Sequence, residues 1–119
     1  MTINCAGTLQ HNSGYGSVAT AYGCRAWANF RGSSTVLLNG SGNVSSITDH
    51  ATGQYSVNFS TSMPDANYGY VGSAGNYDTS STTQYAAIQG PRSTTAQRIF
   101  TQVAGVVNDA LSVAVIIFR

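Results

Sequence analysis

The chain has 119 residues, 42% of them hydrophobic, and its charged residues are five Arg and four Asp, for a formal net charge of +1. This length suits one domain with a single core, and the near-neutral charge excludes the basic field that attracts a nucleic-acid backbone. Lys and Glu, two good helix formers, are absent, while Ser, Thr, Asn and Gly are frequent, so the composition disfavours long helices.

The N-terminal segment 1–23 is rich in Gly, Ser, Asn and Thr, and we expect an irregular entry segment with one short strand near 17–21. It has neither the basic start nor the apolar stretch of a signal peptide. The longest apolar run of the chain, 113–118, is far shorter than the roughly twenty residues of a membrane-spanning helix. We therefore expect no membrane insertion.

Regular strand signals begin at 24–30, where side chains alternate between two faces. The alternation places Cys24, Ala26, Ala28 and Phe30 on one face and Arg25, Trp27 and Asn29 on the other. The first face is that of a packed core, which suits Cys24 as a small buried residue. On the second face, Trp27 is interpreted as packing the scaffold or a subunit contact, with stacking on a sugar ring as the alternative.

The strands continue at intervals of about a dozen residues. We predict them at 35–38, 44–48, 54–60, 67–73, 85–89, 97–103 and 111–118. Turn residues separate them, with the Asn-Gly pair in 39–43 giving a strong hairpin signal and Gly90-Pro91 marking another break. About eight short strands with such spacing predict a single all-β domain over 1–119, with an antiparallel β-sandwich in 24–119.

The last strand, 111–118, is apolar on both faces. Both faces of such a strand must be covered, so it is expected to lie in the centre of the core or to have one face covered by a neighbouring subunit.

Three segments carry a resemblance to a known family: 24–30, 42–49, and 55–59 together with 63–68. They resemble the C-terminal domain of bacteriophage and prophage tail fibre proteins, and the closing strand that ends in Ile117-Phe118-Arg119 is similar to the end of those chains. The resemblance is close over about 22–70 and looser at the tail, and it does not extend to 72–105. The long fibrous shaft that precedes this domain in the family is absent from the sequence.

The resemblance implies a homotrimeric distal domain of a virion fibre, assembled in the host cytoplasm together with other tail proteins. Its expected partner is a polysaccharide or an outer-membrane protein on the host cell. The first alternative is a structural virion component, such as a capping or decoration protein, that binds no receptor. The second is a carbohydrate-active enzyme.

Catalytic and metal-binding patterns are not found, so we expect no enzyme, no cofactor and no metal. Turn chemistry accounts for three of the four Asp, and Asp78 has no acidic neighbour to complete a glycosidase pair. Asp49 and His50 are adjacent and face opposite ways in extended chain, and no G-x-S-x-G elbow is present. Cys5 and Cys24 are expected to be free thiols, with a disulfide between them as the open alternative.

The binding residues are expected in the stretch 70–98, where Tyr, Ser, Gly and Asn occur in the mixture that antibody loops use. Its loops are expected to be either a recognition surface or plain solvated connections. The candidate receptor-binding residues are Tyr70, Tyr77, Asp78, Gln84, Gln89, Arg92 and Arg98.

Overall fold

The computed structural model describes residues 10–13, 16–19, 23–76 and 85–119. These residues form eleven strands and no helix. The strands are β1 (Gln10–Ser13), β2 (Gly16–Ala19), β3 (Cys24–Arg31), β4 (Leu37–Gly42), β5 (Val44–Ala51), β6 (Gln54–Phe59), β7 (Gly69–Gly75), β8 (Tyr85–Arg92), β9 (Ala96–Val103), β10 (Val106–Val107) and β11 (Ser112–Phe118).

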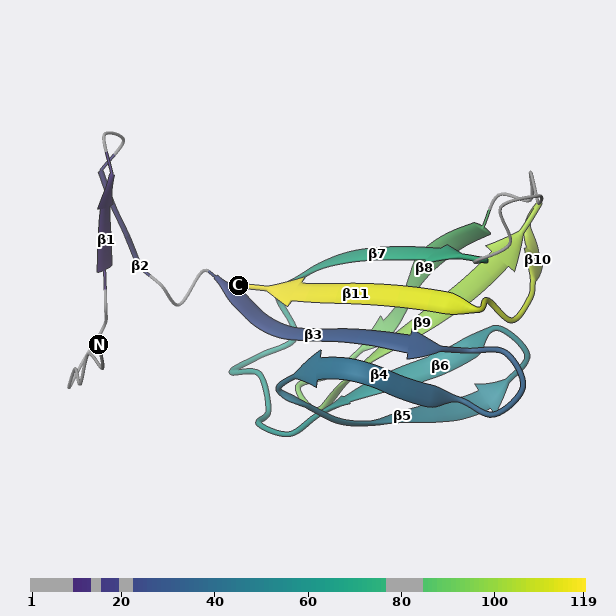
Figure 1. The fold of residues 1–119 in the computed structure, drawn as a ribbon. Helices are drawn as coiled ribbons and strands as arrows, with labels where there is room; N and C mark the ends of the chain where they lie inside the picture. Colours follow the sequence, from purple (N-terminus) through teal and green to yellow (C-terminus); the bar gives the residue numbers. More distant parts are fainter. Residues whose placement is uncertain (1–9, 14–15, 20–22, 77–84) are drawn as a thin grey trace.

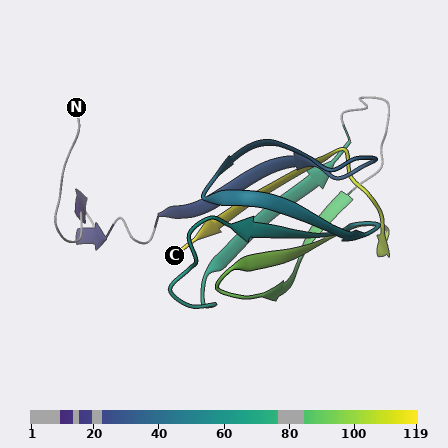
Figure 2. The same cartoon turned by 90° about the horizontal axis from the view of Figure 1, so that it is seen from below.

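Two antiparallel sheets pack face to face, which confirms the predicted all-β sandwich (Figures 1 and 2). Sheet I has the strand order β4-β3-β11-β7. Sheet II has the order β10-β9-β6-β5, and β8 also pairs with β9. The strands β1 and β2 form a hairpin that pairs with neither sheet, so the entry segment holds two strands where one was expected.

The core lies between the inner faces of the two sheets. In sheet II, Tyr55, Val57 and Phe59 of β6 are buried, as the alternation of that strand predicts. From sheet I, Phe30 meets Tyr55 edge to face, with ring centroids 5.3 Å apart at 69°. Ala26 and Ala28 lie on the same buried face of β3 as Phe30.

The prediction that Cys24 is buried on this face is wrong. Cys24 is exposed, and its thiol is free. A bulge pairs it with Phe118, whose side chain points away from the core, and the shift of register moves Cys24 off the inner face. Cys5 lies outside the described residues.

The prediction of a turn at 39–43 is also wrong for most of that segment. β4 runs on through Gly40 to Gly42, and the turn into β5 is made at Asn43, which has a φ of 53°. The ring of Trp27 lies over both glycines, so that a Cβ on Gly42 would come within 2.5 Å of the indole nitrogen. This ring supplies the cross-strand packing that the glycines lack and allows the strand to continue.

The closing strand β11 is central in sheet I, between β3 and β7. Its inner face is fully buried through Val113, Val115 and Ile117. Its outer face, with Ile116 and Phe118, is 47% and 44% exposed in the single chain. The central position agrees with the sequence, but the described residues fully cover just one of the two apolar faces.

Candidate functional site

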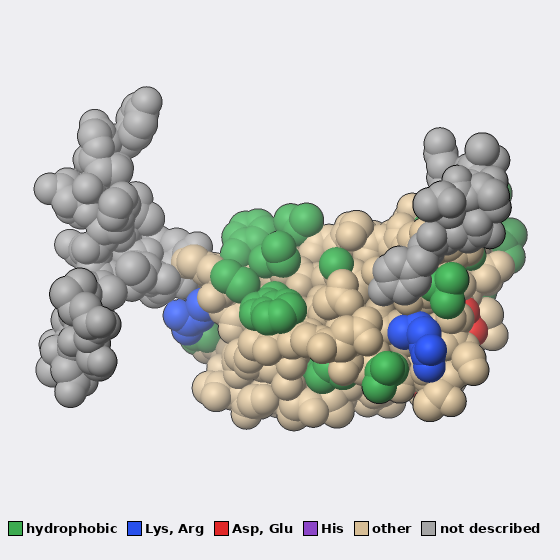
Figure 3. Space-filling view, in the orientation of Figure 1, with side chains coloured by type: hydrophobic (Ala, Val, Ile, Leu, Met, Phe, Trp, Pro, Cys, Tyr) green, Lys and Arg blue, Asp and Glu red, His purple; other side chains and the backbone are tan. Residues whose placement is uncertain are grey.

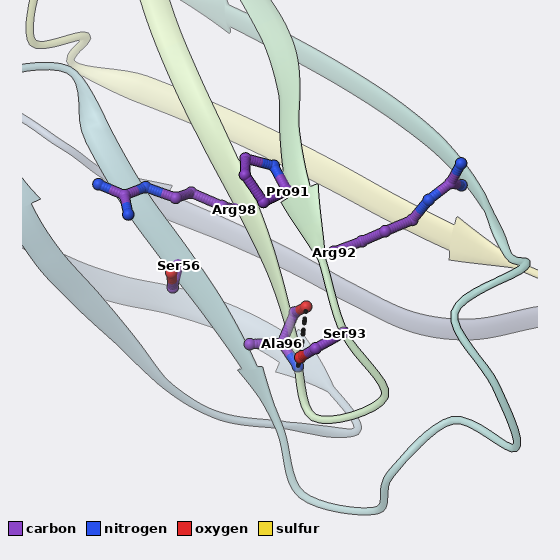
Figure 4. A pocket seen from close by; sticks show the side chains of 6 residues that line it. All are labelled: Ser56, Pro91, Arg92, Ser93, Ala96 and Arg98. Carbon is purple, nitrogen blue, oxygen red and sulfur yellow. Dashed lines mark hydrogen bonds between the residues drawn. The ribbon is translucent and has the colours of Figure 1, made fainter.

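A shallow cavity of about 210 Å³ opens on the outer face of sheet II, where β6, β9 and β8 meet (Figure 4). Its lining residues are Ser56, Pro91, Arg92, Ser93, Ala96 and Arg98. It therefore brings together Arg92 and Arg98, two of the residues predicted from the sequence. It is smaller than the roughly 300–1,000 Å³ of typical ligand pockets.

A bulge in β8 builds one wall of the cavity. The pairing of β8 with β9 shifts between Gln89 and Arg92, so Gly90 and Pro91 fall outside the regular ladder. The fully buried Gln97 donates from its side-chain amide to the carbonyl oxygens of Gly90 and Arg98, at 3.2 and 2.6 Å. Gln97 thus fixes the position of the Pro91 ring.

Gln97 was not among the residues chosen from the sequence. The sequence feature that indicates such a residue is Pro91. A proline inside a strand cannot donate a hydrogen bond to the neighbouring strand, so it marks a bulge whose free carbonyl groups need a hydrogen-bond donor. The residue type that would provide this partner could not be read from the sequence.

Arg98 extends from β9 along the outer face of sheet II. One guanidinium nitrogen donates to the side-chain oxygen of Gln54 on β6 at 2.9 Å, and Cζ lies 5.6 Å from the centroid of the Phe100 ring. Among the described residues, Arg98 forms no ion pair. The side chain is held in place by an amide and a ring.

Arg92 serves a different purpose. Its guanidinium points away from the cavity and from Arg98 (Figure 4). It donates to the backbone oxygen of Tyr68 at 2.7 Å, with Cζ 5.9 Å from the centre of the Tyr68 ring, whose hydroxyl in turn donates to the backbone oxygen of Ser93 at 2.9 Å. Arg92 therefore fastens the segment before β7 to the end of β8.

Polar side chains cover the neighbouring part of this face. The amide of Asn58 on β6 donates to Ser46 and Thr48 on β5, at 3.0 and 2.8 Å. His50 and Ser56 are hydrogen-bonded at 2.8 Å. The face beside the cavity is thus a row of hydroxyl and amide groups already oriented by one another.

The outer face of sheet I has the opposite character. Four exposed hydrophobic side chains of three adjacent strands, here called the apolar row, are Trp27, Val71, Ile116 and Phe118. The pairing places Ile116 directly between Trp27 on β3 and Val71 on β7. Figure 3 shows hydrophobic side chains gathered where β3 and β7 begin and β11 ends.

Glycines make room for two aromatic rings of the apolar row. Phe118 lies over Gly69, its partner on β7, and Trp27 lies over Gly40 and Gly42 of β4. Because the rings lie down on the strands, the face is low and broad, as a surface that meets another sheet must be.

The remaining candidates are placed as follows. Tyr70 is on the inner side of β7 and packs against the core, and burial raises the pKa of its phenol to about 12. Gln89 is exposed on β8, and its side-chain nitrogen donates to the side-chain oxygen of Gln97 at 3.4 Å. Tyr77, Asp78 and Gln84 lie outside the described residues. Gln89, Arg92 and Arg98, which were expected in one loop, lie on the strands β8 and β9.

Within the described residues, no group of three or more His, Cys, Asp or Glu side chains is positioned to hold a metal ion. The same residues contain no helix long and apolar enough to cross a membrane.

Comparison with known proteins gives no relative: no family model, curated protein or solved structure matches the chain. The likeness to tail fibre domains therefore stays a prediction from the sequence.

Proposed function

We propose that the chain is the receptor-binding domain of a bacteriophage tail fibre, which assembles as a homotrimer and attaches to the surface of a host cell. The observation that carries the proposal is the contrast between the two outer faces of the sandwich. One carries the apolar row, and the other carries oriented polar groups around a cavity lined by Arg98, which forms no ion pair within the described part of the chain.

The apolar row supports the assembly. Single exposed hydrophobic residues are ordinary on protein surfaces, whereas contiguous ones mark contact sites. With Trp27, Val71, Ile116 and Phe118 between 44% and 57% exposed, the row presents roughly 300–400 Å² per chain. A standard interface buries about 800 Å² per partner, so the row would form the centre of a subunit contact.

The position of the row supports the same assignment. It is centred on β11, the strand whose sequence is apolar on both sides, and the described residues of the sandwich cover the inner side of that strand. A second copy of the chain packing on the outer face would complete the coverage.

The assembly is tested by sedimentation equilibrium of the purified chain and of two matched variants. Ile116→Lys places a charge in the apolar row, while Ile88→Lys changes an isoleucine of similar exposure, 41%, on the outer face of sheet II. We expect a trimer for the wild type and Ile88→Lys, and a monomer for Ile116→Lys. A monomeric wild type at micromolar concentration would contradict the proposal.

Attachment is tested with the fluorescently labelled chain on a panel of bacterial strains that have outer membranes. The proposed function requires that it bind at least one strain and slow phage adsorption to that strain. A chain that assembles but binds none of the strains would be a structural virion component. Release of reducing sugar from isolated surface polysaccharide would instead indicate a carbohydrate-active enzyme.

A further inference from the structure

The geometry points to the cavity beside Arg98 as a subsite for one acidic sugar unit, a ring that carries a carboxylate. This inference rests on the proposed attachment function, because it names the class of surface molecule that the domain would recognise. It places recognition on the outer face of sheet II, away from the apolar row.

The dimensions of the cavity favour a single ring. Its volume of about 210 Å³ is below that of typical ligand pockets, and it opens onto the polar face formed by β5 and β6. A ring seated in it would leave the rest of a polymer free to continue along that face. The cavity therefore fits one unit of a chain.

The lining fits the two sides of a sugar. Pro91 and Ala96 provide an apolar wall for the C–H groups of a ring. Ser56 provides a hydroxyl, which His50 already orients at 2.8 Å and which keeps further hydrogen-bonding capacity. The bulge that Gln97 fixes holds the Pro91 wall in place before any ligand arrives.

The charge selects an acidic ring. Of the five N–H donors of its guanidinium, Arg98 uses one in a hydrogen bond to Gln54, and it has no ion pair among the described residues. The Nε of this planar guanidinium is buried, so its two terminal nitrogens, held over the Phe100 ring, are the donors that suit a carboxylate. A neutral sugar would cover this charge without pairing it, which is unfavourable.

Arg98 also argues against a polyanion of the nucleic-acid type. Such a ligand needs several cations in a row to release its counterions. Arg92 turns away from the cavity to bind Tyr68, so the site offers a single charge for a single carboxylate.

The test is isothermal titration calorimetry of the full chain with oligogalacturonate, whose units each carry one carboxylate, and with maltooligosaccharide of equal length. We expect binding of the acidic oligomer and at least about tenfold weaker binding of the neutral one. Arg98→Gln should weaken acidic binding at least about tenfold. Arg31→Gln, which removes a half-buried arginine at the end of β3 in sheet I, should leave it unchanged.

A second set of variants keeps the charge and closes the cavity. Ala96→Phe fills the space beside Pro91, and Ala96→Leu is a smaller filler should the first variant not fold. Either should abolish binding of oligogalacturonate. Equal effects of Arg98→Gln and Arg31→Gln, no effect of the fillers, or no binding by the wild type would each overturn the inference.

The inference and the proposed function fail in distinguishable ways. If the wild type attaches to cells and Arg98→Gln attaches equally well, the function stands and the acidic subsite is wrong. If the chain binds oligogalacturonate through Arg98 but attaches to no strain, the subsite stands and the attachment function is wrong.

Discussion

The hydroxyl of Tyr55 joins three parts of the chain, and removing it with Tyr55→Phe is the sharpest test of how the sandwich is held together. Tyr55 is fully buried on β6. Its hydroxyl lies 2.7 Å from a carboxylate oxygen of Asp109 and 2.9 Å from the backbone oxygen of Gly32. The same carboxylate oxygen accepts the backbone N–H of Gly53 at 2.7 Å. The phenol thus links sheet II to the segments that enter β11 and leave β3.

The loss of unfolding free energy caused by Tyr55→Phe follows from these contacts. Phenylalanine keeps the ring against Phe30, so the change removes the hydrogen bonds and little packing. A hydrogen bond to a charged group contributes about 1.5–3 kcal/mol, and Asp109 keeps its bond from Gly53, so we expect a loss of about 2 kcal/mol. Burial and the nearby Asp109 raise the pKa of Tyr55, so the phenol remains a donor over the usual pH range.

The assay is urea unfolding at one fixed protein concentration, because the stability of an oligomer depends on concentration. The matched control is Tyr85→Phe, whose hydroxyl accepts an exposed bond from Asn76 at 3.1 Å and should change stability by less than about 0.5 kcal/mol. In thermal unfolding, Tyr55→Phe should lower the midpoint by about 6–10 °C. Equal stability of the two variants would refute the role given to the Tyr55 hydroxyl.

Three further predictions follow from other contacts. Tyr70→Phe should raise the free energy of unfolding by about 1 kcal/mol in urea titrations, because the buried hydroxyl has no hydrogen-bond partner among the described residues; a loss of stability would contradict this. Acid should destabilise the wild type more than Asp65→Asn in unfolding scans below pH 3.8, the ordinary pKa of this carboxyl. The hydrogen bond from Arg119 lowers the pKa of folded Asp65, so this stability is present above the ordinary value and lost as pH falls through the folded one; equal acid sensitivity would refute it. Dilution should shift the fluorescence of Trp27 to the red as its exposed ring leaves a subunit contact, whereas Ile116→Lys should show the shifted spectrum at every concentration; a spectrum independent of concentration in both would argue against the contact.

The inner faces of the strands could be predicted because they depend on a period of two within one segment. Tyr55, Val57 and Phe59 alternate with polar residues, and all three are buried. Ala26 and Phe30 follow the same rule on β3. Burial on these faces is decided by the strand itself, so one segment of sequence contains the necessary information.

The errors arise where a neighbouring strand decides the outcome. Gly40 and Gly42 indicate a turn when considered alone, but the ring of Trp27 from β3 covers them and the strand continues. Cys24 follows the alternation of β3 until a bulge against β11 changes its side. Register between strands is not readable from one segment, so neither outcome could be predicted.

The candidate site was predictable only in part, for a related reason. Arg92 and Arg98 were chosen as neighbours in one loop region, and they do line one cavity. Their charged groups nevertheless diverge, because the bulge at Gly90 and Pro91 changes which side of β8 the Arg92 side chain leaves. The two arginines and the proline could be chosen from the sequence. The register of β8 against β9 was needed to show that Arg92 turns away from the cavity to bind Tyr68.

On both sheets an aromatic ring lies over glycine on the outer face. The two outer faces are expected to have separate roles, one in assembly and one in sugar binding. Trp27 lies over glycines on sheet I, and Phe100 lies over Gly90 on sheet II, so each sheet presents a flat aromatic surface. The ring of Phe100 carries the guanidinium of Arg98 above it. If the apolar row assembles the subunits and the face with Arg98 binds sugar, Ile116→Lys should lose the trimer while each chain still binds oligogalacturonate. Arg98→Gln should keep the trimer and lose the binding of oligogalacturonate. Loss of both properties in either variant would mean that sugar is bound across subunits, and the assignment of one role to each face would then be wrong.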